Sequence, residues 1–293
     1  MNIDDLKLIL EIEKCGNISV AAHNLFLTQS TASRRLSALE RELNLLLFIR
    51  GKGLDTVAPT PVCKRMSVIA KQIISLDEDA HSLSQYNMIR RLSVGSTDSI
   101  ASYPLRDFFY ELPNRQPNWD VEMLIYDSAP IFDMVANRIL DIGITNGAAP
   151  MPEVESDLLF SEEFVVIRRG KRSDTRDYIH PHELKPNNEI FQIFSSEYQH
   201  WHHTWWPQGI TKFRVNLAHF TVGFLRDPED WAILPLSVAQ ALLPADGYVL
   251  RLLEHPPLRR CFLVRRRELR PDKKELILSF EQELRTYLSN RIT

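Results

Sequence analysis

The sequence predicts a chain of two parts, a small helical N-terminal domain ending in one long helix and a larger C-terminal α/β domain. Three observations predict this division. Amphipathic helical stretches and tight turns fill residues 1–60, a seven-residue apolar repeat follows, and short apolar strands alternate with helices after Arg91. We therefore expect a helix-turn-helix domain at 1–60, a dimerising linker helix at 61–90 and a two-lobed domain at 91–293.

The composition is that of an ordinary globular protein. Hydrophobic residues make up 44% of the chain and charged residues 25%, which fits packed cores and excludes a disordered or fibrous class. The N-terminus lacks the features of a signal peptide, and no apolar run approaches the roughly 20 residues of a membrane helix. Cys15, Cys63 and Cys261 lie far apart. We expect a cytoplasmic protein without a membrane partner.

Residues 28–43 predict a helix with two different sides. Ala32, Leu36 and Leu39 recur at helical steps and form one apolar stripe, and Thr28 is suited to cap the first turn. The other side carries hydroxyl, amide and guanidinium groups. Two shorter helices are predicted upstream, one with apolar residues from Leu6 to Ile12 that stops near Gly16 and one at 18–26 capped by Ser19. Two short helices joined by a tight turn are typical of a helix-turn-helix.

In a helix-turn-helix, the N-terminal residues of the second helix face the bases of the DNA major groove. Glutamine can pair with adenine, arginine with guanine, and hydroxyls with either base or phosphate. Residues 28–65 also carry seven basic side chains against three acidic ones, although a solvated face is the alternative for such a cluster. The predicted DNA-binding residues are Thr28, Gln29, Ser30, Thr31, Ser33, Arg34, Arg35, Arg50 and Lys52. We expect Gln29 and its neighbours near base edges and the arginines mainly at phosphates.

Residues 21–50 resemble the N-terminal signature of LysR-type transcriptional regulators. The matching positions are Ala21, Ala22, Leu25, Thr28, Gln29, Ser33, Leu39, Glu40, Leu43, Leu47, Phe48 and Arg50. The resemblance implies a winged helix-turn-helix with the wing at about 50–58. Asn44 replaces the usual glycine and tolerates a left-handed backbone. The usual Leu-Thr-x-x-Gly after the wing is replaced as well, and Thr60 or Pro61 can start the next helix instead.

The predicted linker helix carries the apolar spacing of a coiled-coil seam. Apolar residues recur at alternating steps of four and three over three heptads. They are Val62, Met66, Ile69, Ile73, Leu76, Ala80 and Leu83. A helix packed on its own domain is the alternative. Because operators are usually read as two half-sites, and because the linker helix of the similar family dimerises, we expect this helix to join protomers into a dimer or a dimer of dimers.

The C-terminal region resembles the effector domain of the same family more weakly, at "LSVGSTDSIASYPLRDFF", "RILDIGI" and "WAILP". The resemblance implies a periplasmic-binding-protein-like fold of type 2. The first lobe would comprise about 91–162 and 265–293, and the second about 163–264. Such clefts hold ligands at strand C-termini and helix N-termini. The candidate effector-binding residues are Ser96, Thr97, Asp98, Ser99, Ser128, Ser195, Ser196 and Thr221. Helix capping by these hydroxyls is the alternative.

Two of these candidates carry a more specific expectation. Ser99 matches the position at which the family often places an effector-binding hydroxyl. Asp98 would disfavour a plain anion and suit a ligand with an amine. Elsewhere, His200, His202 and His203 could ligate a metal. No cysteine or carboxylate stands at ligand spacing beside them, so aromatic packing or an aromatic ligand shelf is favoured, and we expect no metal and no cofactor.

The function predicted from these features is a ligand-responsive transcriptional regulator and not an enzyme. Its expected partners are double-stranded DNA, an unknown small-molecule effector and further copies of itself, with RNA polymerase as another candidate. The alternatives are a constitutive DNA-binding regulator with a degenerate cleft and an α/β enzyme with an accessory helix-turn-helix. The enzyme signatures GxSxG, GxGxxG, GxxxxGK and HExxH are absent.

Overall fold

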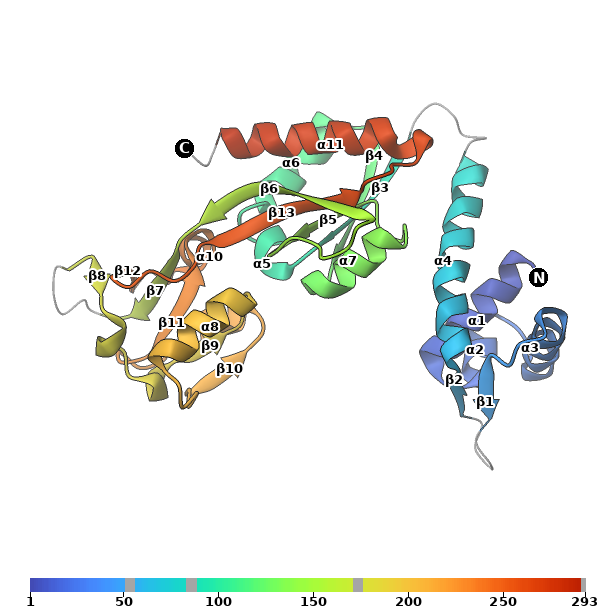
Figure 1. Cartoon of the computed structure of the whole chain (residues 1–293), viewed down its shortest axis with the longest axis horizontal. Coiled ribbons are helices and arrows are strands. Elements are labelled where there is room, and N and C mark those ends of the chain that lie inside the picture. The colour runs from blue at the N-terminus through green and yellow to red at the C-terminus, as the bar shows by residue number, and fades with distance from the viewer. Residues whose placement is uncertain (51–55, 83–88, 171–175, 291–293) are drawn as a thin grey trace. The chain divides into compact units, whose positions relative to one another are not determined.

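The computed structural model describes residues 1–50, 56–82, 89–170 and 176–290 (Figure 1). The chain forms two compact units, one of residues 1–89 with 137–139 and one of residues 90–136 with 140–293. Within the described ranges, no helix is long and apolar enough to cross a lipid bilayer.

Three short helices form the N-terminal part of the first unit. They are α1 (Ile3–Cys15), α2 (Ile18–Asn24) and α3 (Gln29–Leu43). Thr28 caps α3 as expected, because its hydroxyl accepts the Thr31 amide. The expected cap of α2 at Ser19 is wrong. Asn17 is the cap, since it precedes the first turn and its carboxamide oxygen accepts the amides of Ser19 and Val20.

The three helices bury one continuous apolar core. Its residues are Leu6, Leu8, Ile9, Ile12, Ile18, Ala21, Ala22, Ala32, Leu36, Leu39, Leu47, Phe48, Val57, Cys63 and Ala70. The helix α3 ends at Asn44, whose backbone is left-handed with φ of 52°. The Glu40 carboxylate then accepts the backbone amides of Leu47 at 2.8 Å and Phe48 at 3.2 Å. These bonds hold the start of the following strand against α3.

The strands β1 (Phe48–Arg50) and β2 (Val57–Pro59) pair in antiparallel fashion, with Phe48 opposite Pro59. Two paired strands therefore lie where the wing was expected, and residues 51–55 lie outside the described residues. Thr60 follows, accepts the Cys63 amide at 3.1 Å and donates to the Leu46 carbonyl at 2.9 Å. This hydroxyl starts α4 (Pro61–Ser82), as the sequence predicted.

The helix α4 uses its apolar residues on two faces rather than one. Cys63 and Ala70 are fully buried in the core of the unit. Met66 and Ile73, which we expected in the dimer seam, also pack partly against that core. The remaining expected seam residues Val62, Ile69 and Leu76 are 41%, 48% and 52% exposed. Ala80 is exposed, and Leu83 lies outside the described residues.

The second unit contains two lobes, each built on its own sheet. The first lobe has the strand order β4 (Trp119–Ile125), β3 (Arg90–Ser96), β5 (Ile142–Thr145), β13 (Arg259–Arg266) and β6 (Val154–Glu162). Its helices are α5 (Asp98–Ala101), α6 (Arg106–Arg115), α7 (Ser128–Ala136) and α11 (Pro271–Ser289). Phe108 of α6 and Phe280 of α11 pack in one core, and Ile131 of α7 packs in another.

The second lobe has the strand order β11 (Trp231–Pro235), β7 (Phe164–Arg169), β12 (Gly247–Leu252) and β8 (Tyr178–Ile179). The parallel pair of β9 (Ile190–Gln192) and β10 (Phe213–Val215) joins it through a bridge between Glu189 and Trp231. Its helices are α8 (Ser196–Trp205), α9 (Ala218–Gly223) and α10 (Leu236–Leu242). Figure 1 shows α8 beside the β9–β10 pair.

The predicted two-lobed α/β architecture is confirmed, with one corrected boundary. We expected the chain to return to the first lobe at residue 265. It returns at Arg259, because β13 pairs along its length with β6, from Arg259 opposite Glu162 to Arg266 opposite Val154. Residues 259–264 therefore belong to the first lobe. Arg259 lies opposite Glu162, at the point where the chain passes from the first lobe to the second.

Candidate nucleic-acid interface and ligand cleft

The N-terminal half of α3 presents polar side chains to the outside. Gln29, Ser30 and Arg34 are exposed, whereas Ala32 and Leu36 on the opposite side are at most 1% exposed. The Thr28 hydroxyl lies 2.8 Å from that of Thr31 and 3.1 Å from that of Ser30. Ser33 is half-buried. The two sides predicted for this helix are therefore present, and contact of these residues with DNA stays a prediction.

The two adjacent arginines of α3 have different surroundings. The Arg35 guanidinium donates to the Asp5 carboxylate at 3.0 Å and to the Asn2 carboxamide at 3.2 Å. It lies 3.6 Å from Asp4 as well. Arg35 thus ties α3 to the start of α1, and a role at phosphates would compete with these bonds. Arg34 is exposed, and within the described ranges no acidic side chain pairs with it.

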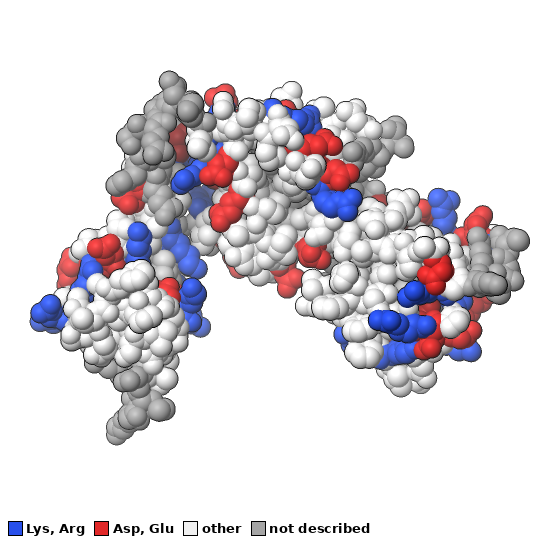
Figure 2. Space-filling model, turned by 180° about the vertical axis from the view of Figure 1, so that it is seen from behind, with Lys and Arg blue, Asp and Glu red and all other residues white. Residues whose placement is uncertain are grey.

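On the face of the N-terminal unit shown in Figure 2, basic and acidic side chains both occur, and much of the surface between them is uncharged. Two of the predicted basic contacts cannot be placed. The backbone of Arg50 ends β1, but its side chain lies outside the described part of the chain, and so does Lys52.

A buried guanidinium, that of Arg259, joins polar groups of the second unit. The Arg259 side chain is 1% exposed. Its Nε donates to Asn146 Oδ1 at 2.9 Å, its Nη1 to Glu162 Oε1 at 3.0 Å and its Nη2 to Ser99 Oγ at 2.9 Å. Glu162 in turn accepts the backbone amide of Ser237 at 2.8 Å. Because Ser237 lies in the first turn of α10, the network links the first sheet to a helix of the second lobe.

The same network gathers three of the hydroxyl residues predicted for the first lobe. Ser99 is bound by Arg259, and the Asn146 carboxamide donates to the Thr97 hydroxyl at 3.3 Å. The Asn146 amide donates to the Ser128 hydroxyl at 3.2 Å. Sequence reasoning missed both Arg259 and Asn146. The available signal for Arg259 was an arginine at the start of a strand whose centre, Cys261–Val264, is apolar, and no local signal marked Asn146.

A cavity of about 330 Å³ lies between the lobes. It is lined by Asn146, Gly147, Ala148, Phe164, Phe194, Ser195, Ser196, Glu197, Leu258, Arg259, Arg260 and Phe262. Ser195 and Ser196 therefore lie where the sequence predicted, with Ser195 capping α8 through the Tyr198 amide. They face Asn146 and Arg259 of the first lobe across the cavity.

Six of the eight predicted effector residues do not line this cavity. Thr97, Ser99 and Ser128 belong to the network of Arg259 and Asn146, and the other three make contacts elsewhere. The Asp98 carboxylate accepts the hydroxyl of Ser102 at 2.9 Å, within its own helix. Ser96 is fully buried and donates to the Thr97 carbonyl. Thr221 is fully buried too, and its hydroxyl donates to Gln192. The expectation that Asp98 selects an amine in the cleft therefore has no geometric support here.

The histidine-rich stretch contains one buried hydrogen-bonded pair. His202 Nε2 lies 2.7 Å from Glu189 Oε1, and both side chains are less than a tenth exposed. His200 and His203 are exposed. In the described part of the chain, no three His, Cys, Asp or Glu side chains are arranged to hold a metal ion. Burial raises the pKa of Glu189, and the His202 hydrogen bond opposes this only in part.

We expect Glu189→Gln to raise the melting temperature at about pH 8 and to leave it unchanged at about pH 4. Because the folded pKa lies above the ordinary value of 4.5, the contribution of Glu189 to stability falls as pH rises through that interval. Glutamine keeps a hydrogen-bonding group without the buried charge. Differential scanning calorimetry against pH measures the effect. The exposed Glu229→Gln serves as control, and an equal gain at both pH values would contradict the prediction.

The cysteines of the second unit and of α4 are packed side chains. Cys261 and Cys63 are fully buried. Burial raises the pKa of Cys261 to about 12 and that of Cys63 to about 11. Since the thiolate is the reactive form, neither residue is suited to redox chemistry at neutral pH.

Two models of known families match this chain. The "LysR substrate binding domain" matches residues 88–286, and the "Bacterial regulatory helix-turn-helix protein, lysR family" matches residues 3–64. The chain belongs to the LysR family of transcriptional regulators. The family predicted from residues 21–50 is confirmed. The LysR-type assignment also removes the enzyme alternative, because members of this family are regulators of transcription.

Curated relatives match this LysR-type regulator over part of their length. The regulator YofA of Bacillus velezensis is 26% identical over 181 residues, which are 61% of this chain and 62% of that protein. The regulator HdfR of Yersinia enterocolitica is 30% identical over 164 residues, 54% of each protein. The matched region therefore spans between 54% and 62% of these relatives.

Solved LysR-type structures share the fold over nearly the whole chain. Full-length CbnR, solved in complex with its target DNA, superposes with a TM-score of 0.71 and 17% identity, covering 98% of this chain and all of that one. A full-length OxyR variant of Pseudomonas aeruginosa superposes with a TM-score of 0.62 and 18% identity, covering 98% of this chain and 94% of that one. At this level of identity the likeness concerns the fold alone.

Proposed function

We propose that this LysR-type regulator binds an inverted-repeat operator as a dimer through its two α3 helices, and responds to a small molecule in the cleft between its lobes. The observation that carries the proposal is the division of α3 into a buried apolar side and an exposed polar N-terminal half. Such a helix can enter a major groove without exposing its core.

Within α3, two side chains are best placed for distinct tasks. Gln29 is exposed in the first turn, where a carboxamide can bond an adenine edge. Arg34 is exposed one turn further and is the arginine of the adjacent pair that is not tied to α1. We assign Gln29 to base recognition and Arg34 to phosphate or guanine. The relative CbnR was solved with its target DNA, which supports a DNA-bound state for the shared fold.

The exposed stripe of α4 supports the dimer. Val62, Ile69 and Leu76 stand seven residues apart, which places them on one side of the helix. A second copy of α4 would cover these three side chains while Cys63 and Ala70 stay in the core of their own unit. A further exposed apolar surface, made by Phe213 of β10 and Phe220 of α9 with Phe224 in ring contact with both, supports contacts between effector domains in a dimer of dimers.

The cleft supports regulation by a ligand, because residues of both lobes line it. A ligand that contacts Asn146 and Ser196 across the cavity would favour one arrangement of the lobes over another, in proportion to its difference in affinity for the two. The second candidate is a constitutive regulator. It is favoured by the bond from Arg259 to Ser99, because protein atoms already satisfy the hydroxyl expected to bind the effector.

We expect Gln29→Ala to weaken specific operator binding by about tenfold to a hundredfold and to leave binding to unrelated DNA unchanged. The reason is that a base-edge contact contributes only at the correct base pair. Fluorescence anisotropy with the DNA upstream of the protein's own gene measures both affinities. Arg34→Ala should weaken binding to both DNAs and lower the salt dependence by about one released ion if it contacts phosphate.

Arg41→Ala is the matched control, because Arg41 is exposed at the far end of α3 and donates to the Ser37 carbonyl. It should bind like the wild type. Absence of binding by the wild-type chain at low salt, or equal losses for Gln29→Ala and Arg41→Ala, would contradict the proposal.

A further inference from the structure

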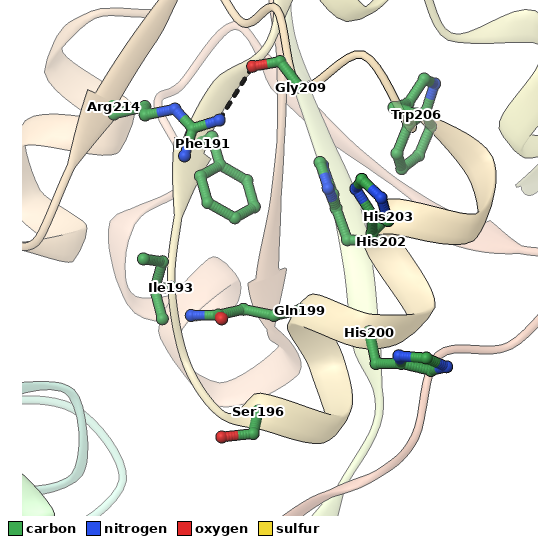
Figure 3. Close-up of a pocket in the computed structure, with 10 residues that line it drawn as sticks. All are labelled: Phe191, Ile193, Ser196, Gln199, His200, His202, His203, Trp206, Gly209 and Arg214. Carbon is green, nitrogen blue, oxygen red and sulfur yellow. Dashed lines mark hydrogen bonds between the residues drawn. The ribbon is translucent and has the colours of Figure 1, made fainter.

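A second cavity lies entirely within the second lobe, between α8 and the β9–β10 pair (Figure 3). Its volume is about 410 Å³, within the range of sites for small molecules. It is lined by Phe191, Ile193, Ser196, Gln199, His200, His202, His203, Trp206, Gly209 and Arg214. No first-lobe residue takes part, and the two cavities share only Ser196.

One permanent charge borders this cavity, and it is positive. None of the ten lining side chains is acidic, and Arg214 is the one arginine. Its Nη2 donates to the Gly209 carbonyl at 2.8 Å, and within the described ranges no carboxylate pairs with it. Other cations of the lobe are neutralised, as Arg169 is by Asp246 at 2.9 Å. Arg214 therefore keeps guanidinium donors for an anion from solution.

Arg214 is oriented by an aromatic ring and by the Gly209 carbonyl, and its charge also interacts at longer range with the buried Glu189 carboxyl. Its guanidinium carbon lies 5.2 Å from the centroid of the Phe191 ring, a cation–π distance. Figure 3 shows the guanidinium beside that ring and joined to Gly209. A guanidinium held in this way offers the planar, two-pronged geometry that suits a carboxylate.

The wall next to Arg214 is a row of aromatic rings. The Phe191 and His202 centroids are 4.5 Å apart, and those of His202 and Trp206 are 4.7 Å apart. The hydrogen bond of His202 to the buried Glu189 fixes the middle ring. The wall therefore suits a flat aromatic ligand, which would gain from ring contacts as well as from burial.

We propose that this groove is a binding site for a small aromatic carboxylate, separate from the cleft between the lobes. The carboxylate pairs with Arg214, and the ring packs against Phe191, His202 and Trp206. Gln199, which points toward Ile193 in Figure 3, lies at the far end and can bond a polar substituent of the ring. This site goes beyond the proposed function, because it neither requires nor occupies the cleft.

The test uses the full chain and three probes of similar size: naphthoate, its neutral amide naphthamide, and the saturated, non-aromatic decahydronaphthoate. Isothermal titration calorimetry gives the affinities, and the Arg214→Gln variant shows whether the bound probe occupies this cavity. We expect naphthoate to bind at least about tenfold more tightly than either of the other probes. Arg214→Gln should weaken naphthoate binding by about tenfold or more, since a charge-assisted pair is lost.

Arg260→Gln is the matched control, because Arg260 lines the cleft and is a similarly exposed arginine. It should leave naphthoate binding within about twofold of the wild type. Three results would each overturn the proposal: no naphthoate binding at about 10 mM, equal binding of naphthamide, or a loss with Arg260→Gln and none with Arg214→Gln. Melting curves of both variants establish that the fold is retained.

Discussion

Replacing Arg259 by alanine is expected to lower the free energy of unfolding of the second unit by about 3–5 kcal/mol. The side chain is almost fully buried, and three donors leave with it. The Glu162 carboxylate then keeps its negative charge in a largely buried position without a cation. Asn146 and Ser99 each lose a hydrogen-bond donor as well. Chemical denaturation followed by circular dichroism measures the loss.

A double-mutant cycle separates this ion pair from packing. The cycle compares Glu162→Gln alone, Arg259→Met alone and the two together. Each single variant leaves one buried charge without its partner, whereas the double variant removes both charges. We expect the double variant to be more stable than the sum of the single losses predicts, because the two charges neutralise one another. Additive losses would show that Arg259 acts through packing and that the link between the lobes does not depend on its charge.

Replacing Ile69 by aspartate is expected to convert the proposed dimer to a monomer and to weaken operator binding by about 10²- to 10⁴-fold. Ile69 stands at the centre of the exposed stripe of α4, 48% exposed in the single chain. In the dimer it would face its own copy, so two buried carboxylates would oppose each other. Loss of the dimer removes the second half-site contact, which is the origin of the large effect. Light scattering and fluorescence anisotropy measure the two quantities.

Two variants act as controls for this experiment. Ile69→Leu keeps an apolar side chain of equal size and should remain dimeric. Lys71→Asp places an acid on an exposed position of α4 outside the stripe and should also remain dimeric. The monomer's melting temperature should hardly change with Ile69→Asp, because that side chain is not in the core. A dimer that persists with Ile69→Asp would place the interface elsewhere.

Local chemistry was enough to predict most of the N-terminal unit. The cap at Thr28, the buried stripe of Ala32, Leu36 and Leu39, and the left-handed Asn44 follow from residues within one or two helical turns of each other. The cap of α2 shows the limit even at short range. Asn17 and Ser19 are both good capping residues, and the choice between them depends on where the first helical turn begins.

Contacts between distant segments decided the rest. Arg35 looked equivalent to Arg34 until α1 brought Asp5, 30 positions away, within 3.0 Å of it. The repeat on α4 predicted one seam. In the structure, Cys63 and Ala70 are buried in the core of the N-terminal unit, whereas Ile69 on another side of the helix is exposed. Neither outcome follows from spacing, because spacing specifies which residues share a face and not what covers that face.

The sequence by itself determined the family, the two-part architecture and the polar half of α3, because each depends on periodicity or on a motif of adjacent residues. Only the tertiary structure decided the Arg259 network and the aromatic groove beside Arg214. Arg259 meets Asn146 across 113 positions and Ser99 across 160, through strand pairing whose register no local pattern specifies. A buried charge reveals its partners only when the chain has folded around it, since the same arginine on an exposed strand would be solvated.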